Sequence, residues 1–442
     1  MSLPDGINYN AQKMDSAVVD SQLVEIQPMN GRSFSGQSQI ILELPNRPFS
    51  FYDLESSTLS MSVKNGDTTH AVAFDSTLAS LINRMQITNA GSVLSDVVDY
   101  NKVHAFMMDY QTSREERATR LAITSGNAVP IDTCVIPGTP LRAAVAANAD
   151  GPLIAAVADL TQTIVKGSAR LGESIAAGAT KNFSTQLIGS IFSSNKYINA
   201  GLASPLTINL FLEEAKKAFK GDASLADSEI TITDVKLQFQ SIRVEPGVYN
   251  QIASQGFTYQ CEDYATSRST IEQTATAHTV TLPFRYSKLK SVYHLFFKQA
   301  NLVDGTARSQ TGRVGITALK FKEYYLNIAG SKFPAMNVAE FNVFEKLMQS
   351  LGVSGYDSHQ ISVSDVEAKG EAFAIGLDLE AVRNKGDTLM SGASTIDSSV
   401  APVFTFSAAR ADDPGVVAVI HVATYDSLIQ MDPATRLLVL ST

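Results

Sequence analysis

Residues 81–107 read LINRMQITNAGSVLSDVVDYNKVHAFM, and residues 318–348 read ALKFKEYYLNIAGSKFPAMNVAEFNVFEKLM. Both stretches contain an extended apolar segment, Ala-Gly-Ser, a second extended segment and then an amphipathic helical pattern. Gly91 and Gly330 supply the positive φ that a tight hairpin favours. Ala-Gly-Ser alone is a common combination, but the whole ordered series is not. The sequence therefore predicts a duplicated unit in which a β-hairpin precedes a short helix.

An acidic-aromatic-Asn triplet opens the helical pattern in both copies. The first copy has Asp99-Tyr100-Asn101, and the second has Glu340-Phe341-Asn342. The acid lies where the positive end of a helix dipole favours negative charge. The triplets therefore predict the helix N-termini.

Strand-like segments surround each copy of this unit. Ser57–Val63 and Ile230–Val244 alternate between apolar and polar residues, as half-buried strands do. About eight short strands per half with uneven loops indicate a jelly roll. We therefore predict an all-β chain of two tandem eight-stranded antiparallel jelly-roll β-sandwiches, with short helices in the connecting loops. The remaining predicted strands are Gln39–Leu44, Leu206–Leu212, Phe257–Tyr264, Thr279–Phe284, Lys288–Phe297, Phe373–Leu379, Val403–Phe406, Val416–Val422, Leu437–Leu440 and a strand beginning at Phe183.

The predicted boundaries follow from composition. Residues 1–30 are polar and irregular and are expected to form an N-terminal arm, followed by a first jelly roll over 31–265. A Thr/Ser/Gln-rich linker at 266–277 leads to a second jelly roll over 278–442. The first half carries an insertion at about 118–180, rich in Ala, Gly, Thr and Pro, for which the second half has no counterpart. We expect this insertion to form an outer tower or to contact a neighbouring subunit.

Composition narrows the class of protein. The chain has 442 residues, 44% hydrophobic and 18% charged, a net charge of −9 and a pI of about 5.3. No basic run is present, which argues against direct binding of a phosphate backbone. We expect no secretory signal, because the first 25 residues lack an apolar core, and no transmembrane helix. Cys134 and Cys261 either form one bridge or, as we favour, remain unpaired thiols.

The motifs tested for chemistry assign no catalytic, cofactor-binding or metal-binding residue. Residues 167–174 resemble a phosphate-binding loop, but Glu173 replaces the required lysine. Asp378 and Glu380 share one face of a predicted strand, where they would hold a cation or, as we favour, form a solvated strand end. We therefore expect no enzyme activity. The six histidines are scattered without metal-ligand spacing: His70, His104, His278, His294, His359 and His421.

Several blocks of sequence resemble double jelly-roll major capsid proteins of the adenovirus, virophage, polinton-like virus and membrane-containing phage lineage. In the first half they are QIILELPNRPFSFYDLESSTLSMSVKN, LINRMQITNAGSVLSDVVDYN, FSTQLIGSIFSSNKYINAGLASPLTINLFL and ITITDVKLQFQSIRVEPGVYNQI. In the second half they are VTLPFRYSKLKSVYHLFF, YLNIAGSKFPAMNVAEFN and FAIGLDLEAVRNKGDTLMSG.

The resemblance implies a structural capsid protein of an icosahedral virion, assembled inside the host cell. It implies a homotrimer of pseudo-hexagonal outline that contacts neighbouring capsomers, penton and minor capsid proteins and, where one is present, an internal membrane. Sequence-specific nucleic-acid binding is not expected. The alternative is a tandem β-sandwich spike or adhesin that binds a receptor or glycan, although such a protein does not need two near-equivalent halves.

The N-terminal arm has its own expected role. Its acidic residues outnumber its one lysine, Lys13, which favours contact with a neighbouring protein over contact with lipid headgroups or nucleic acid. On this interpretation, removal of residues 1–28 leaves folded trimers that assemble poorly.

Overall fold

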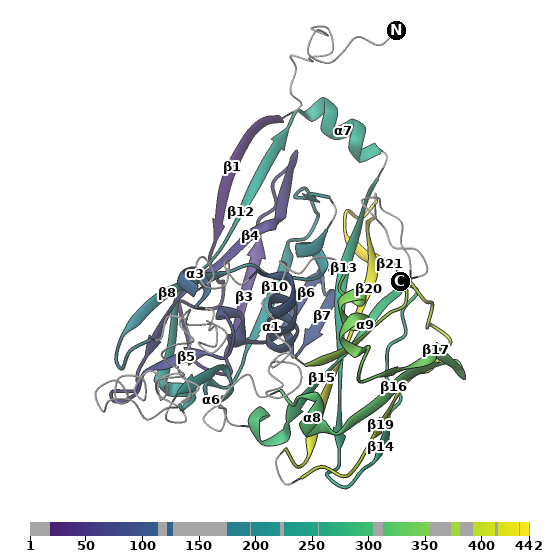
Figure 1. The fold of residues 1–442 in the computed structure, drawn as a ribbon. Helices are drawn as coiled ribbons and strands as arrows, with labels where there is room; N and C mark the ends of the chain where they lie inside the picture. The colour runs from purple at the N-terminus through teal and green to yellow at the C-terminus, as the bar shows by residue number, and fades with distance from the viewer. Residues whose placement is uncertain are drawn as a thin grey trace, which may run out of the picture.

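The computed structural model contains two β-sandwiches that lie side by side, with the long strand β13 (Phe257–Ile271) between them (Figure 1). It describes residues 18–113, 122–126, 175–194, 196–221, 225–254, 256–303, 313–352, 373–380, 392–411, 414–432 and 434–441. All structural statements below refer to these residues.

The first sandwich is built from two antiparallel sheets. One has the order β1-β12-β4-β8, and the other has the order β3-β10-β6-β7. Its main strands are β1 (Val18–Ile26), β3 (Gln39–Leu44), β4 (Ser50–Asn65), β6 (Ile82–Asn89), β7 (Ser92–Val98), β8 (Thr180–Thr185), β10 (Leu206–Leu212) and β12 (Ile230–Val244). Shorter elements at its margins are β2 (Ser33–Phe34), β5 (Val72–Phe74), β9 (Ile198–Asn199) and β11 (Phe219–Gly221).

The second sandwich repeats this arrangement. Its sheets have the orders β13-β20-β15-β18 and β14-β19-β16-β17. Besides β13, its strands are β14 (Ala277–Thr279), β15 (Leu289–Lys298), β16 (Phe321–Ile328), β17 (Ser331–Ala339), β18 (Ala374–Asp378), β19 (Val400–Phe406), β20 (Val417–Met431) and β21 (Leu438–Ser441), of which β21 pairs with β20.

Both sandwiches have the same topology. If the eight main strands of each half are numbered along the chain, each half has one sheet of order first-eighth-third-sixth and one of order second-seventh-fourth-fifth. Two antiparallel four-stranded sheets joined in this way form a jelly roll. The predicted fold class is therefore confirmed. The strand bounds of β3, β10 and β12 coincide with the predicted ones.

The predicted start of the first jelly roll was wrong. Val18–Ile26, placed in the arm by the sequence, forms β1 and pairs with β12 from Val18↔Val244 to Ile26↔Leu237. Val24 and Ile26 point into the sandwich and are buried. The segment resembles an arm in sequence because most of its other side chains are exposed. The partner strand β12 supplies the hydrogen bonds that order it.

The predicted end of the first jelly roll was wrong for the same reason. β13 pairs with β20 over its whole length, from Phe257↔Met431 to Ile271↔Val417. It is therefore the first strand of the second sandwich, and part of the expected linker 266–277 lies within it. The polar run 266–270 suggested a linker because several of these side chains face outward. The predicted strand Thr279–Phe284 is also displaced, since β14 ends at Thr279 and Leu282 makes only an isolated bridge to Val400.

The duplicated hairpins are present as predicted. β6 and β7 pair through Asn89↔Ser92, and β16 and β17 pair through Ile328↔Ser331. Gly91 has φ +83° and Gly330 has φ +84°, and a Cβ at either position would meet no atom within 4 Å. Space is therefore not the constraint at these turns; backbone conformation is.

Replacing Gly91 or Gly330 by Val is expected to lower the free energy of unfolding by about 1–3 kcal/mol, because a β-branched residue is strained at positive φ. Thermal melts of each variant measure the effect. Gly247→Val is the matched control, since Gly247 also has open space but no positive φ. If all three variants melt like the unaltered chain, the turn assignment is wrong.

Short helices follow the hairpins and fill the loops. α1 (Tyr100–Gln111) follows β7, and α9 (Val343–Ser350) follows β17. The N-cap of α1 is Asp99, in the left-handed region at φ 55°, but its carboxylate makes no capping hydrogen bond. The other α-helices are α3 (Ala122–Ser125), α6 (Ala215–Ala218), α7 (Pro246–Ser254) and α8 (Ile316–Leu319); the 3-10 helices are Leu78–Leu81, Ser190–Ser193, Asp227–Glu229 and Gln299–Leu302.

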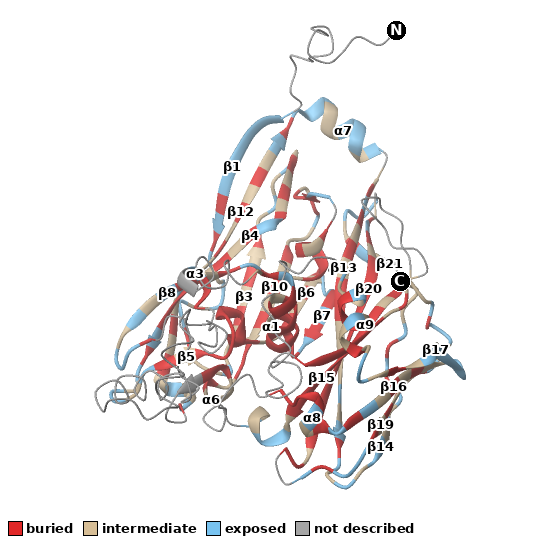
Figure 2. Cartoon of the chain, viewed as in Figure 1, coloured by how far each residue is buried: buried red, intermediate tan, exposed pale blue. Residues whose placement is uncertain are grey.

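Burial follows the layers of the sandwiches (Figure 2). One cluster of buried apolar side chains fills the second sandwich, from Ile271 to Ala423. A larger cluster fills the first sandwich and continues onto the outer face of the sheet β13-β20-β15-β18. The two halves therefore share buried surface.

The insertion at about 118–180 lies mostly outside the described residues. Its described ends are anchored on the first sandwich: α3 packs near β8, and Ile175 pairs with Val72. Among the described helices, none combines the length and hydropathy needed to cross a bilayer.

Candidate functional site

The two sandwiches meet at the seam, which we define as the contact between the first sandwich and the outer face of the sheet β13-β20-β15-β18. Phe106 of α1 lies 5.1 Å from the ring of Tyr293 on β15. Tyr293, Leu295 and Phe297 belong to the same buried cluster as the core of the first sandwich. A large apolar interface of this kind holds two domains in one orientation.

Polar contacts frame the apolar part of the seam. Arg268 Nε of β13 donates to Asp99 Oδ2 at 2.7 Å, and a second guanidinium nitrogen binds Asp99 Oδ1. Thr266 Oγ1 donates to the carbonyl of Val98 at the end of β7 (2.8 Å). Farther along, Arg313 binds the carboxylate of Asp109 on α1 at 2.8 Å. The acid of the first triplet thus joins the two sandwiches rather than capping a helix.

Buried carboxyl groups lie on β13 and β20 at the seam. Burial raises the pKa of Asp263 to about 7, although the backbone N–H of Tyr264 and the hydroxyl of Tyr425 donate to it. Burial also raises the pKa of Asp426 to about 6, while Lys290, 3.7 Å away, opposes the rise. Both groups take up protons close to neutral pH.

Lys290 gathers the carboxylates at one end of the second sandwich. Its Nζ lies 2.5 Å from Glu262, 3.7 Å from Asp426 and 4.0 Å from Glu380. Burial opposes its charge, but the three carboxylates together raise its pKa. The Asp378–Glu380 pair considered as a cation site therefore borders an ammonium group, and the strand end is half-buried rather than fully solvated.

Three histidines that are scattered in the sequence meet inside the second sandwich. His294 of β15 and His421 of β20 face each other in register, with Nδ1 to Nδ1 at 2.7 Å. His294 Nε2 lies 2.6 Å from the hydroxyl of Tyr324, and His421 Nε2 lies 2.8 Å from Ser269 Oγ. Ser269 Oγ is also 3.1 Å from His278 Nε2. We call these five residues the histidine chain.

The histidine chain is satisfied without any charge. If Tyr324 donates to His294, each following group accepts from one neighbour and donates to the next, as far as His278. Burial lowers the pKa of His421 to about 3 and lowers that of His294 well below its usual value. Burial and the charge of Arg410 lower the pKa of His278 as well, and interactions with His421 and His278 further lower the pKa of His294. The imidazoles are therefore neutral at physiological pH.

The sequence contained a signal for this chain that spacing motifs miss. His294 and His421 each stand in the middle of an otherwise apolar strand, YHLF and IHVA. A buried polar side chain in such a strand needs a hydrogen-bond partner. Within the described part of the chain, no group of three or more His, Cys, Asp or Glu residues is placed to hold a metal ion.

The other residues considered for chemistry lie apart from one another. Burial raises the pKa of the Cys261 thiol, which lies on β13 at the seam, to about 12, so it is unreactive. His104 lies on α1, is buried and contacts the carbonyl of Gln186. His70 binds Asp67 in a loop. Cys134, His359 and residues 167–174 lie outside the described residues.

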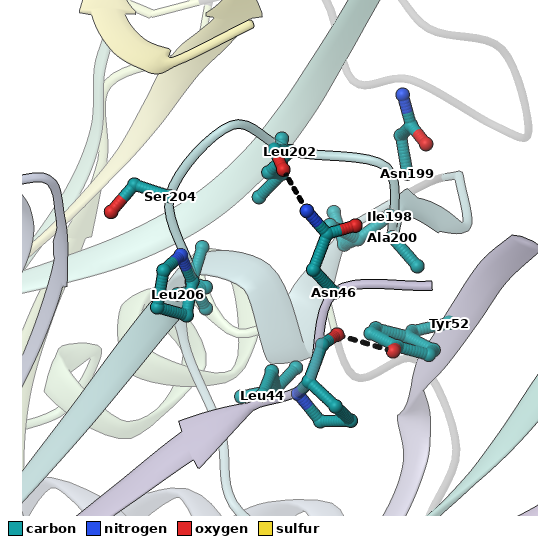
Figure 3. Close-up of a pocket in the computed structure, with 11 residues that line it drawn as sticks. Leu44, Asn46, Tyr52, Ile198, Asn199, Ala200, Leu202, Ser204 and Leu206 are labelled. Carbon is teal, nitrogen blue, oxygen red and sulfur yellow. Dashed lines mark hydrogen bonds between the residues drawn. The ribbon is translucent and has the colours of Figure 1, made fainter. Parts of the chain in front are cut away.

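A small pocket lies between β3, β4 and the loop before β10 (Figure 3). Tyr52 donates to the carbonyl of Pro45 at 2.5 Å, and Asn46 Nδ2 donates to the carbonyl of Leu202. Its cavity volume is about 10 Å³, whereas one ordered water needs about 10–15 Å³ and ligand sites are far larger. The pocket therefore holds no small-molecule ligand.

Comparison with known proteins gives a clear result at the level of structure. No protein-family model matches the sequence, and no curated protein matches it. The Faustovirus major capsid protein has a TM-score of 0.64 at 11% identity, covering 96% of this chain and 92% of that one. VP54 of PBCV-1, fitted into a reconstruction of the virophage Sputnik, has a TM-score of 0.59 at 10% identity, covering 98% and 99%. A structure of the Sputnik virophage itself has a TM-score of 0.57 at 12% identity, covering 100% and 92%.

These likenesses extend over nearly the whole chain and include both sandwiches. At 10–12% identity they establish a shared fold. The chain therefore has the double jelly-roll fold seen in viral major capsid proteins.

Proposed function

We propose that this chain is the major capsid protein of an icosahedral virion, in which it forms homotrimeric capsomers of pseudo-hexagonal outline. The observation that carries the proposal is the tandem pair of jelly rolls with one topology. Three such chains present six similar sandwiches, which allows one protein to tile a hexagonal lattice. The role is structural rather than enzymatic.

We place the first jelly roll from β1 to β12 and the second from β13 to β21. The helix α7 then connects the two sandwiches. Residues 1–17 precede the first strand. The insertion at about 118–180 faces outward or contacts a neighbouring subunit, since it leaves and rejoins the first sandwich at its margin, near β5 and β8.

The partners are neighbouring capsomers, together with penton and minor capsid proteins. The net charge of −9 and the lack of a basic run disfavour direct contact with packaged nucleic acid. A membrane or another protein then lies between shell and genome.

The test is the size and shape of the purified protein. Light scattering should give a trimer, and electron micrographs of the assembled material should show hexagonal particles. A stable monomer that binds a receptor or a glycan would instead support the spike or adhesin alternative.

Deletion of residues 140–165 tests the place of the insertion. We expect both sandwiches to keep their melting temperature, since Ile175 and Val72 remain paired, while trimer stability or surface antigenicity changes. Unfolding of the first sandwich would show that the segment belongs to its core.

A further inference from the structure

The seam within one chain is a template for a contact between chains. In the first sandwich, the fifth strand β7 and the helix after it, α1, supply the contact. In the second sandwich, the first strand β13 and the outer face of its sheet receive it. The contact therefore joins different surfaces of two equivalent units, which is a head-to-tail arrangement.

Each surface of the seam has an equivalent elsewhere in the same chain. By topology, β17 and α9 of the second sandwich correspond to β7 and α1. Likewise, β1 and the outer face of the sheet β1-β12-β4-β8 correspond to β13 and its sheet. In Figure 1, β1 and β17 lie on opposite sides of the molecule, so they do not meet within one chain.

The surface of the second sandwich that corresponds to β7 and α1 carries exposed apolar residues. β17 is the free edge of its sheet, and Met336 on it is 82% exposed. Phe341, in the second acidic-aromatic-Asn triplet, is 87% exposed, whereas Tyr100 at the same place in the first triplet is fully buried. Glu340 is exposed as well, while its counterpart Asp99 is buried and bound to Arg268. The same sequence pattern is thus covered in one half and uncovered in the other.

The surface of the first sandwich that corresponds to β13 and its sheet is uncovered too. Leu23 of β1 is 68% exposed and faces away from the core, because its neighbour Val24 points inward. Beside it, the outer face of β12 presents Lys236, Gln238 and Gln240. Glu25 binds Lys236 at 2.9 Å, and Ser21 accepts from Gln240 at 2.6 Å. This face is mostly polar, unlike the apolar face at the seam.

We propose that β17 and Phe341 of one copy dock against β1 and the adjoining face of β12 in a second copy of the chain. This contact repeats between copies what β7 and α1 do within one copy. It rests on the proposed trimer and names the surfaces that build it. The polar receiving face keeps the free chain soluble, and the apolar side chains Leu23, Met336 and Phe341 anchor the contact once copies meet. Each copy contributes β17 and Phe341 to one contact and β1 and β12 to the next contact, so three copies close a ring.

Cross-linking tests the pairing of these two surfaces. Leu23→Cys and Met336→Cys are made singly and together in a Cys134→Ser background that keeps the buried Cys261, and the proteins are treated with a short bis-maleimide. The double variant should give covalent dimers and trimers. Either single variant alone should stay monomeric on a denaturing gel, and a mixture of the two should stop at dimers. Cross-linking of either single variant to itself would indicate a two-fold contact and overturn the proposal.

A second variant tests the anchor. Phe341→Asp should weaken association by about 30-fold, as for loss of a central interface residue, with an unchanged melting temperature of the monomer. Val303→Asp is the control, because Val303 is also an exposed apolar residue of the second sandwich but lies outside both surfaces. This pairing is overturned if Phe341→Asp forms trimers normally and the double cysteine variant gives no cross-links. The proposed capsomer would then stay intact. Absence of any trimer in the unaltered protein would instead overturn the proposed function.

Discussion

Removal of residues 1–28 is expected to destabilise the first sandwich by several kcal/mol and to expose an aggregation-prone edge. The deletion takes away β1 with the buried side chains of Val24 and Ile26. Each such side chain contributes about 1.5–3 kcal/mol when fully buried, and the hydrogen bonds to β12 are lost as well. The free energy of unfolding of a whole domain is only about 5–15 kcal/mol. The uncovered backbone of β12 is then free to pair with another chain.

Deletion of residues 1–17 is the matched control, since it leaves β1 whole. Thermal melts should show a large drop for the longer deletion and none for the shorter one. Hydrogen exchange should localise the loss to β12 and β4. This expectation replaces the one drawn from sequence, in which the longer deletion leaves folded trimers. Equal melting temperatures for the two deletions would show that β1 adds nothing to the fold.

Acidification is expected to destabilise the second sandwich through the histidine chain. A histidine whose pKa is lowered on folding adds stability that is complete above its ordinary value of 6.5 and is lost as the pH falls toward the folded value. For His421, with a folded pKa of about 3, the loss at pH 5 is about 2 kcal/mol. His294 acts in the same direction. The chain of hydrogen bonds can take up one proton, but a second would set two N–H groups against each other between the rings.

The buried carboxyl groups act in the opposite sense. The pKa values of Asp263 and Asp426 are raised on folding, to about 7 and about 6. Their burial therefore destabilises the ionised protein, and stability is regained as the pH falls from about 7 toward the ordinary value near 4. The net change in stability on acidification is the difference between the loss caused by the histidines and the gain from the carboxyl groups.

Substitutions separate the two contributions. Between pH 7.5 and pH 5.0, the free energy of unfolding of the double variant His294→Gln/His421→Gln should fall by at least about 2 kcal/mol less than that of the unaltered chain. The Asp263→Asn variant should lose more stability than the unaltered chain over the same pH range, because it lacks the gain that comes from protonation of Asp263. Urea unfolding at the two pH values measures both. An unaltered pH response in the double histidine variant would show that the chain does not control acid stability.

The strands with regular alternation could be predicted from sequence, including their ends. β12 alternates along fifteen residues, and its predicted bounds were correct. The turns at Gly91 and Gly330 could also be predicted, because positive φ is a local backbone conformation that glycine adopts readily. Most elements of the duplicated unit therefore follow from local chemistry.

The site was less accessible to sequence reasoning. His294 and His421 stand 127 positions apart, and only the register of β15 with β20 sets them opposite each other. Asp99 has the position of a helix cap, but Arg268 on β13 is close enough to take its carboxylate. In both cases a contact between distant segments outweighs the local preference.

By itself, the sequence determined that the chain is all-β, duplicated and free of the spacing motifs of common active sites, because periodicity and turn residues report local conformation and half-burial. Tertiary structure alone decided which strands belong to which sandwich. β1 and the polar second half of β13 carry too little apolar alternation to identify themselves as strands. They are strands because β12 and β20 offer them a ladder of backbone hydrogen bonds, and a pairing partner far along the chain leaves no mark on local sequence.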